Sequence, residues 1–272
     1  MTRSVAFADP GRWVPFDGER CTPFVTTRIL SAHVHRYLAT LDIARGKRVL
    51  DIACGEGYGA AMLIRNGAKA VTGADLDAAT VARAGEVYAH PGLDFVQADI
   101  TCPLPFADDA FDLVVSFETI EHVEAQAAFL DEVARVLTPN GTFICSTPDT
   151  RHSDPSTPNP FHQKELTEDE FIELLSGRFA HVTRQYQGYV LGSVISGSGE
   201  EAHHWQRRGF LDYEEDGGAA QRFYILACAS NAGERFLPNG LLHDGAIVST
   251  LNKRIAELEA RVAELQKAEE TI

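Results

Sequence analysis

A glycine-rich turn, set between an apolar run and a helical segment, constrains this chain more than any other feature. Residues 51–59 read Asp-Ile-Ala-Cys-Gly-Glu-Gly-Tyr-Gly, with a strand-forming run at 48–52 and a helix predicted over 60–65. Glycines let the backbone turn sharply and let a ligand approach the main chain without a Cβ in the way. The helix that follows offers unpaired N–H groups to a polar or anionic ligand. The Gly-x-Gly-x-Gly spacing differs from the Gly-x-Gly-x-x-Gly of dinucleotide-binding turns.

Strand and helix patterns alternate over residues 47–147, which predicts a doubly wound α/β domain. The alternation implies a parallel sheet with right-handed crossovers. Further strands are predicted at 70–74, 93–96, 111–117, 141–146, 179–186 and 222–229, and further helices at 80–89, 125–137 and 168–175. The run at 111–117, Phe-Asp-Leu-Val-Val-Ser-Phe, is typical of a strand that is buried on both faces.

The flanks of this alternation divide the chain into an N-terminal helical extension (1–45), a central domain (46–236) and a C-terminal helix (248–272). The extension carries a helix predicted over 26–41. The stretch 187–220, rich in Gly, Ser and charge, is too long for a hairpin turn and is a candidate lid over an acceptor. Coiled-coil spacing is shown by Leu251, Ile255, Leu258, Val262 and Leu265. It favours self-association through 251–265, and a helix folded back on the domain is the alternative.

Charge and cysteine usage exclude several classes of protein. The 24 Lys and Arg residues against 39 Asp and Glu residues give a formal net charge of −15, which repels nucleic acid and anionic membranes. The five cysteines are scattered and form no Cys-x-x-Cys pair, as expected for reduced thiols in a cytosol. No apolar run approaches the roughly 20 residues that cross a bilayer, and the first residues lack the apolar core of a signal peptide. We therefore expect a cytoplasmic protein with no transmembrane segment.

Acidic residues accompany the first three predicted strands. Asp51 lies in the first, Asp75 ends the second and Asp99 follows the third. Because the carboxyl ends of parallel strands lie at one edge of a sheet, we expect these side chains to share a ligand site. A carboxylate at Asp75 suits the two hydroxyls of a ribose, and Asp99 with the amide of Ile100 suits an adenine edge. The pattern therefore predicts a nucleoside site.

Five stretches together resemble the class I S-adenosylmethionine-dependent methyltransferases. They are VLDIACGEGYGA, GADLD, QADI, FDLVVSFETIEHV and RVLTPNGTFICSTP, within residues 47–150. The resemblance implies a Rossmann-like sheet of seven strands with an antiparallel last strand, and S-adenosyl-L-methionine as cofactor. It places the cofactor against Asp51, Ala53, Gly55, Gly57, Gly59, Asp75, Leu76, Asp99, Ile100 and Phe117. Phe117 and Glu118 would face the sulfonium.

Three flanking stretches resemble a subgroup found in bacterial surface-polysaccharide (O-antigen type) biosynthesis loci. They are FDGER at 16–20, HVHRY at 33–37 and NPFHQKE at 159–165. Some members of this subgroup are fused to glycosyltransferases or carry coiled coils. The resemblance implies O-methylation of a sugar in a surface glycan or in its nucleotide- or lipid-linked precursor.

Methyl transfer from a sulfonium is an in-line displacement, so a base helps only where the acceptor carries a proton. The catalytic candidates are His122, His162 and Glu118, with His122 oriented by a neighbouring carboxylate on the turn after the fourth strand. Helix capping is the non-catalytic alternative for Glu121 and His122. The run also resembles the E-x-x-E-H of ubiquinone-type O-methyltransferases, which can hold a divalent metal. Glu118, Glu121 and His122 are thus an alternative metal set, although the preferred interpretation has no metal.

Two other functions stay open on the sequence alone. The first is O-methylation of a small molecule, such as a quinone precursor or a natural-product intermediate, with or without a metal. The second is a non-catalytic coiled-coil assembly module, although such a module has no physical need of Asp75, Asp99 and the glycine turn. A nucleic-acid acceptor is not expected, because the chain is acidic and has no Asn-Pro-Pro-Tyr-type tetrapeptide.

Overall fold

The computed structural model describes residues 28–152, 159–189, 204–207, 213–216 and 222–239. The helices are α1 (Arg28–Ala44), α2 (Tyr58–Arg65), α3 (Ala78–Val87), α4 (Gln126–Val136) and α5 (Glu168–Ser176), with short 3₁₀ helices at Ile120–His122 and Thr150–His152. The strands are β1 (Arg48–Ile52), β2 (Ala70–Asp75), β3 (Leu93–Gln97), β4 (Phe111–Phe117), β5 (Leu137–Pro148), β6 (His181–Gly188), β7 (His204–Arg207), β8 (Tyr213–Asp216) and β9 (Arg222–Ser230). Within these ranges no helix has the length and apolar character needed to cross a membrane.

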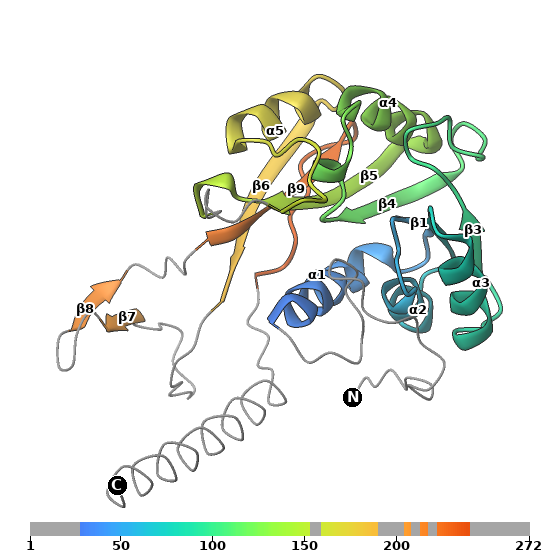
Figure 1. The fold of residues 1–272 in the computed structure, drawn as a ribbon, viewed down its shortest axis with the longest axis horizontal. Helices are drawn as coiled ribbons and strands as arrows, with labels where there is room; N and C mark the ends of the chain where they lie inside the picture. Colours follow the sequence, from blue (N-terminus) through green and yellow to red (C-terminus); the bar gives the residue numbers. More distant parts are fainter. Residues whose placement is uncertain (1–27, 153–158, 190–203, 208–212, 217–221, 240–272) are drawn as a thin grey trace, which may run out of the picture.

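Seven strands form one twisted sheet in the order β3-β2-β1-β4-β5-β9-β6 (Figure 1). The strands β1 to β5 pair in parallel, whereas β9 runs antiparallel to both of its neighbours. The predicted seven-stranded Rossmann-like sheet with an antiparallel last strand is therefore confirmed.

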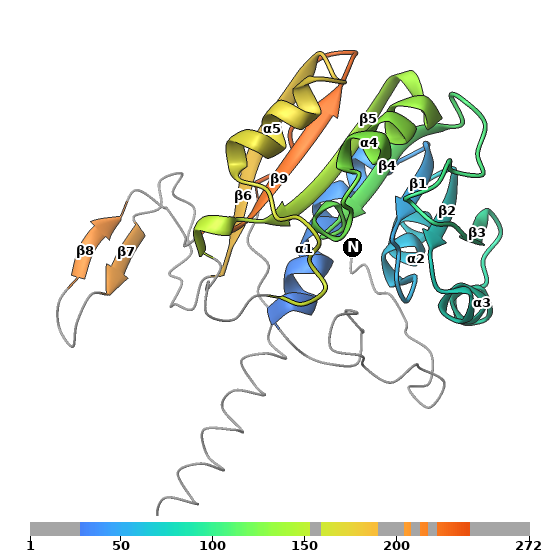
Figure 2. The same cartoon turned by 45° about the horizontal axis from the view of Figure 1, so that its top comes forward.

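Each face of the sheet packs against its own helices (Figure 2). On one face, Phe129 of α4 and Phe171 of α5 are buried in the same apolar cluster as Val114 of β4. On the other face, Tyr37 of α1 and residues of α2 are buried with Val115 of β4. Neighbouring β4 residues thus serve opposite cores, which explains why this strand reads as a continuous apolar run.

The boundary between β1 and β4 is the point where the strand order reverses. The connection after β1 runs through α2 on one face, and the connection after β4 runs through α4 on the other. The chain segments that leave the carboxyl ends of β1 and β4 therefore diverge. Open α/β sheets bind their ligands at such a switch point.

Most predicted elements are present with boundaries shifted by at most three residues, and β5 begins four residues earlier than predicted. The exception is the segment 187–220, a candidate lid in which no strand was predicted. Within it β7 and β8 pair antiparallel as a separate two-stranded sheet, from His204 opposite Asp216 to Arg207 opposite Tyr213. The predicted coiled-coil helix at 248–272 lies outside the described residues.

Candidate functional site

The glycine turn after β1 passes through three left-handed backbone positions. Ala53, Gly55 and Gly57 have φ angles of 56°, 51° and 80°. A Cβ on Gly57 would lie 2.6 Å from the Phe95 ring of β3, and a Cβ on Gly59 would lie 1.9 Å from the ring of Tyr37. These two glycines therefore let protein side chains pack closely under the turn. We had expected the missing Cβ atoms to make room for a ligand.

Asp75 is held against the glycine turn by two backbone amides. Its Oδ2 accepts a hydrogen bond from the Gly55 N–H at 2.8 Å, and its Oδ1 accepts one from the Asp77 N–H at 3.1 Å. The carboxylate is thereby oriented at the carboxyl end of β2. The next residue, Leu76, has a side chain that is 64% exposed. An exposed leucine suits the apolar surface of a nucleoside base, and the oriented carboxylate beside it suits the ribose hydroxyls.

Asp51 is a buried carboxyl group at the end of β1. Tyr37 of α1 donates a hydrogen bond from its hydroxyl to both carboxyl oxygens, at 3.0 and 3.2 Å. Burial raises the pKa of Asp51 to about 7, which the Tyr37 hydrogen bond counteracts and the charge of Asp75 reinforces. A cationic ligand group beside such a buried carboxyl stabilises its ionised form.

Asp99 and Ile100 follow β3, and the side-chain hydrogen bonds of Asp99 in the described structure are local. The exposed Asp99 side chain accepts hydrogen bonds from the N–H and the hydroxyl of Thr101, at 2.8 and 2.6 Å. These hydrogen bonds lower the pKa of Asp99. Ile100 is half-buried against the α4–α5 core. Their predicted contact with an adenine stays a prediction.

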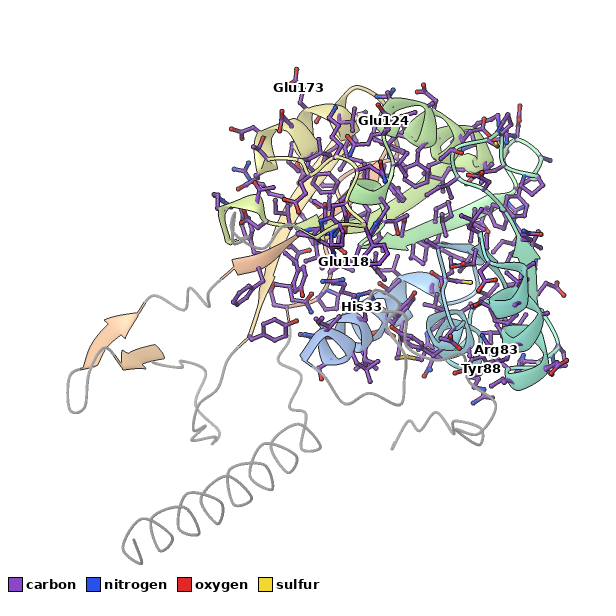
Figure 3. The ribbon with its side chains drawn as sticks, in the orientation of Figure 1. His33, Arg83, Tyr88, Glu118, Glu124 and Glu173 are labelled. Carbon is purple, nitrogen blue, oxygen red and sulfur yellow. The ribbon has the colours of Figure 1, made fainter. Side chains whose placement is uncertain are left out.

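Glu118 ends β4 in a left-handed conformation, with a φ of 55°. Its Oε1 accepts a 2.5 Å hydrogen bond from the hydroxyl of Ser146 and lies 3.1 Å from Nη1 of Arg36. Figure 3 shows the labelled Glu118 between α1 and the end of β4. The carboxylate is therefore used to hold α1 against the sheet, and the preceding Phe117 packs edge-on against Tyr37.

Arg36 is the buried partner of Glu118, and it also joins α1 to β6 at the edge of the sheet. Its Nε donates to Oε1 of Gln187 on β6 at 2.7 Å, and its guanidinium lies 4.3 Å above the Tyr224 ring. The sequence analysis names Arg36 and Tyr37 only within the HVHRY run and does not identify Glu118 and Asp51 as their partners. The HVHRY run is the sequence feature that could have indicated two separate contacts, because adjacent residues of a helix point in different directions.

Glu121, His122 and His162 meet beyond the ends of β4 and β5. One potential ligand atom from each lies within 4.8 Å of the others, and the two imidazole rings pack edge-on with centroids 4.9 Å apart. Glu121 is buried and accepts a hydrogen bond from the Thr147 hydroxyl at 3.1 Å. Burial and the charge of Glu118 raise its pKa. Thus His162, and not Glu118, joins the pair that we had considered as metal ligands.

The imidazole of His162 is already engaged on both nitrogens. Its Nδ1 lies 2.6 Å from Oε1 of Glu165, and its Nε2 lies 3.0 Å from Nδ2 of Asn159. A metal ion needs a lone pair on one of these nitrogens, so it would have to displace a partner. The trio as it stands therefore fits hydrogen bonding better than metal coordination.

A surface hollow of about 440 Å³ lies where α5 meets β6. Glu168 contacts three of the other lining residues: it pairs with Arg151 at 2.8 Å and with Arg184 at 3.3 Å, and it accepts a hydrogen bond from Tyr186. Arg151 also pairs with Asp149, at 2.5 Å. The arginine charges are thus compensated, and the hollow offers both donors and acceptors.

Comparison with known proteins agrees with this geometry. Residues 50–145 match the family described as "Methyltransferase domain". The chain is 40% identical over 167 residues to a Mycolicibacterium smegmatis protein named "Probable S-adenosylmethionine-dependent methyltransferase", covering 60% of this chain and 63% of that protein. A Mycobacterium tuberculosis protein with the same description is 42% identical over 145 residues, covering 52% and 51%. The chain thus spans less than two thirds of the length of the curated relatives that it matches.

A further relative is named for its acceptor. It is the Mycobacterium ulcerans protein "Probable phthiotriol/phenolphthiotriol dimycocerosates methyltransferase 2", which is 42% identical over 110 residues, 40% of this chain and 42% of that protein.

Two solved structures share the fold. One is a chain of the complex between the Trm112 methyltransferase activator and a methyltransferase from Haloferax volcanii, with a TM-score of 0.56, 19% identity and coverage of 74% of this chain and 90% of that chain. The other is a methyltransferase described from Bacillus halodurans, with a TM-score of 0.52, 18% identity and coverage of 72% and 99%. The chain therefore shares the fold of these methyltransferases, and its residues 50–145 match the methyltransferase-domain family.

Proposed function

We propose that this chain transfers the methyl group of S-adenosyl-L-methionine to a hydroxyl group of an acceptor. One observation carries the proposal: the β1–β4 switch point has two oriented carboxyl groups on one side and two histidines on the other. Asp51 and Asp75 lie at the ends of β1 and β2, and His122 and His162 lie beyond β4. A cofactor bound at the carboxyl groups would then lie next to an acceptor bound at the histidines.

The cofactor roles follow from the charges of these groups. The buried Asp51 carboxylate pairs with the α-amino group of the cofactor. Each Asp75 oxygen holds one backbone N–H and retains a lone pair for a ribose hydroxyl. Leu76 offers an exposed apolar surface to the adenine, whose edge is read by Asp99 and the Ile100 amide. Phe117 and Glu118 would lie nearest the sulfonium.

S-adenosyl-L-methionine supplies a methyl group on a positively charged sulfur. The protein must then align an acceptor oxygen behind that methyl group and remove its proton. The cluster after β4 provides two imidazoles for this purpose, His122 and His162. Glu118 serves as a positioning residue through its ion pair with Arg36.

A sugar hydroxyl, in a surface glycan or its nucleotide- or lipid-linked precursor, is the acceptor that we favour. The flanking stretches at 16–20, 33–37 and 159–165 support this choice. The hollow around Glu168 supports it as well, because charge-compensated donors and acceptors suit hydroxyl groups, which both donate and accept.

A lipid or small-molecule hydroxyl is the second candidate. One relative is named for phthiotriol and phenolphthiotriol dimycocerosates. In addition, the Phe161 side chain is 46% exposed while its carbonyl contacts His122. An exposed aromatic ring beside the histidines suits an acceptor with an apolar part.

The test is release of S-adenosylhomocysteine with three acceptor panels: nucleotide sugars, lipid-linked saccharides, and long-chain or phenolic alcohols. We expect turnover with a sugar-bearing panel and an unchanged rate after chelator treatment. Turnover confined to the alcohols would favour the second candidate. Binding of the cofactor without turnover in any panel would contradict the proposed transfer.

We also propose that the methyltransferase domain spans residues 46–236, that residues 251–265 mediate self-association, and that the chain works in the cytoplasm. The heptad spacing supports the second point. The acidic charge and the unpaired cysteine pattern support the third.

A further inference from the structure

His33 is a half-buried imidazole on α1 that makes no hydrogen bond or ion pair with the residues that the structure describes. Side chains three and four positions apart share one face of a helix, and Arg36 and Tyr37 stand at those positions after His33. His33 therefore projects from the same face as the two residues that contact Glu118 and Asp51. Figure 3 shows the labelled His33 on α1, below the labelled Glu118.

The direction of α1 places His33 beyond the carboxyl ends of the strands. The helix ends at Ala44, shortly before β1 begins, whereas Tyr37 reaches Asp51 near the other end of that strand. The helix thus runs antiparallel to β1, and its first half extends past the strand. His33 precedes Tyr37 by one turn, which is about 6 Å along the helix axis. It therefore lies over the sheet edge at which the cofactor and the acceptor would meet.

This part of α1 faces the acceptor side of the site. The carbonyl of Ala32 accepts a hydrogen bond from the Gln187 side chain of β6 at 3.0 Å. One turn later, the guanidinium of Arg36 lies 4.3 Å from the centroid of the Tyr224 ring on β9. Both contacts belong to the half of the sheet that is remote from β2 and β3, where the nucleoside would bind. A ligand group that reaches His33 would thus come from the acceptor.

The imidazole of His33 is neutral at physiological pH. Burial and the charge of Arg36 hold its pKa well below the ordinary value. A neutral imidazole offers one hydrogen-bond donor and one acceptor, which matches a hydroxyl group, since a hydroxyl also donates and accepts. The low pKa makes the same ring a weak base, because an effective general base has a pKa near the working pH. His33 thus suits the binding of a hydroxyl better than the removal of its proton.

We propose that His33 is an acceptor-binding residue whose imidazole hydrogen-bonds a hydroxyl group of the acceptor. The proposal rests on the proposed methyl transfer and adds α1 to its acceptor site. It accounts for a half-buried polar ring that has no partner within the described part of the chain, since buried polar groups are normally hydrogen-bonded. It also leaves proton removal to the two histidines beyond β4.

The placement of His33 can be tested without an acceptor. Ring ¹³C–¹H correlation spectra of the full chain with labelled histidine report each imidazole, and His33→Phe assigns its signal. We expect the His33 signal to move when S-adenosylhomocysteine binds, because the sulfur of that ligand would lie at the same sheet edge. The signal of His181, which is exposed at the start of β6, should stay in place. A His33 signal that does not respond to the bound ligand would overturn the placement.

The role of His33 is tested by kinetics on the acceptor found with the panels above. His33→Phe removes both nitrogens and keeps a ring, so it should raise the acceptor KM by about 2–12-fold, the effect of one lost hydrogen bond. The affinity for S-adenosylhomocysteine should not change. His33→Gln keeps a donor and an acceptor on its amide and should recover part of the loss.

His35→Phe is the matched control. Successive helix residues are about 100° apart, so His35 projects from the side of α1 opposite to His33. Its acceptor KM should equal that of the wild type. An unchanged KM in His33→Phe, or an equal change in both variants, would overturn the role of His33. A loss of S-adenosylhomocysteine affinity with an unchanged acceptor KM would overturn it as well, in favour of a contact with the cofactor.

Failure of the methyl transfer itself would give a different result. The His33 signal would then respond to S-adenosylhomocysteine as expected, while the wild type would turn over no acceptor in any panel. That outcome would contradict the proposed function and, with it, an acceptor role for His33, although the position of the ring at the sheet edge would stand.

Discussion

The Asp51 carboxyl connects cofactor binding to pH. It is buried at the end of β1, and burial raises its pKa from 3.8 to about 7 although the Tyr37 hydroxyl donates to it. A raised carboxyl pKa means that the folded protein binds more protons than the unfolded chain between these two values. This group's contribution to stability therefore falls as the pH rises from about 4 to about 7 in the ligand-free protein.

Cofactor affinity should show the opposite dependence. The cofactor's amino group is cationic and favours ionised Asp51, so affinity should rise with pH, by at most about tenfold per unit, and level off above about 7. Titration calorimetry between pH 5.5 and 8.5 measures this directly. Tyr37→Phe should move the midpoint upward because the lost hydrogen bond favours the ionised form, whereas the control Tyr186→Phe should not. An affinity independent of pH in the wild type would contradict the pairing.

A substitution at Gly59 tests whether the glycines of the turn are required for the close packing of side chains. A Cβ there would lie 1.9 Å from the Tyr37 ring, which also donates to Asp51. We expect Gly59→Ala to lower the free energy of unfolding by about 1–3 kcal/mol through overpacking and to weaken cofactor binding. The control is Gly85→Ala in α3, where nothing lies within 4 Å and helix propensity predicts a gain of about 0.5–1 kcal/mol. Equal urea midpoints for the two variants would contradict the packing role.

At the scale of elements, α1 is the part that completes the site. Its adjacent residues Arg36 and Tyr37 point to different strands, one to Glu118 directly after β4 and Gln187 of β6, the other to Asp51 of β1. A helix outside the alternating core thus sets the position of groups at three strand ends.

Arg36→Ala should be costly because it leaves the Glu118 carboxylate without its cation. Arg36 is fully buried and Glu118 is 15% exposed, so we expect a loss of about 3–5 kcal/mol in stability. Arg48→Ala is the matched control: Arg48 pairs with Asp112 at the surface, where an ion pair contributes about 0–1 kcal/mol. Urea unfolding of both variants checks the difference, and equal losses would contradict the role given to Arg36.

The sequence predicts the elements of this fold better than the contacts between them. Strand β4 was predicted with its observed boundaries, because a strand buried on both faces reads as one apolar run. The pairing of β7 with β8 was missed, since charged strands lack that pattern. The meeting of His122 with His162 could not be predicted from spacing either, because 40 residues and two strand ends separate them. Nor does local periodicity indicate the left-handed φ of Glu118, which aims its carboxylate at Arg36.

At the scale of the whole molecule, the strand order decides where chemistry can occur. The order β3-β2-β1-β4-β5-β9-β6 brings the glycine turn and the histidine cluster to neighbouring strand ends, although about 65 residues separate them. In the proposed function, the acceptor would bind along the ends of β4, β5 and β6. Variation beyond β5 would change the acceptor without disturbing the cofactor contacts.

Self-association belongs to this scale too. The heptad seam includes Leu258, so Leu258→Glu should shift the chain toward monomer in sedimentation velocity. Ala256→Glu adds the same charge off the seam and should leave the distribution unchanged. A wild type that stays monomeric at all accessible concentrations would contradict association through 251–265.

The most direct test of the account is titration calorimetry of the whole chain with S-adenosyl-L-methionine and S-adenosylhomocysteine. We predict micromolar binding of both by the wild type. Asp75→Asn should weaken both at least tenfold, since each charge-assisted hydrogen bond contributes about 1.5–3 kcal/mol, and the surface control Asp112→Asn should not. No binding of either ligand by folded wild-type protein, or wild-type affinity in Asp75→Asn, would contradict the cofactor site described here.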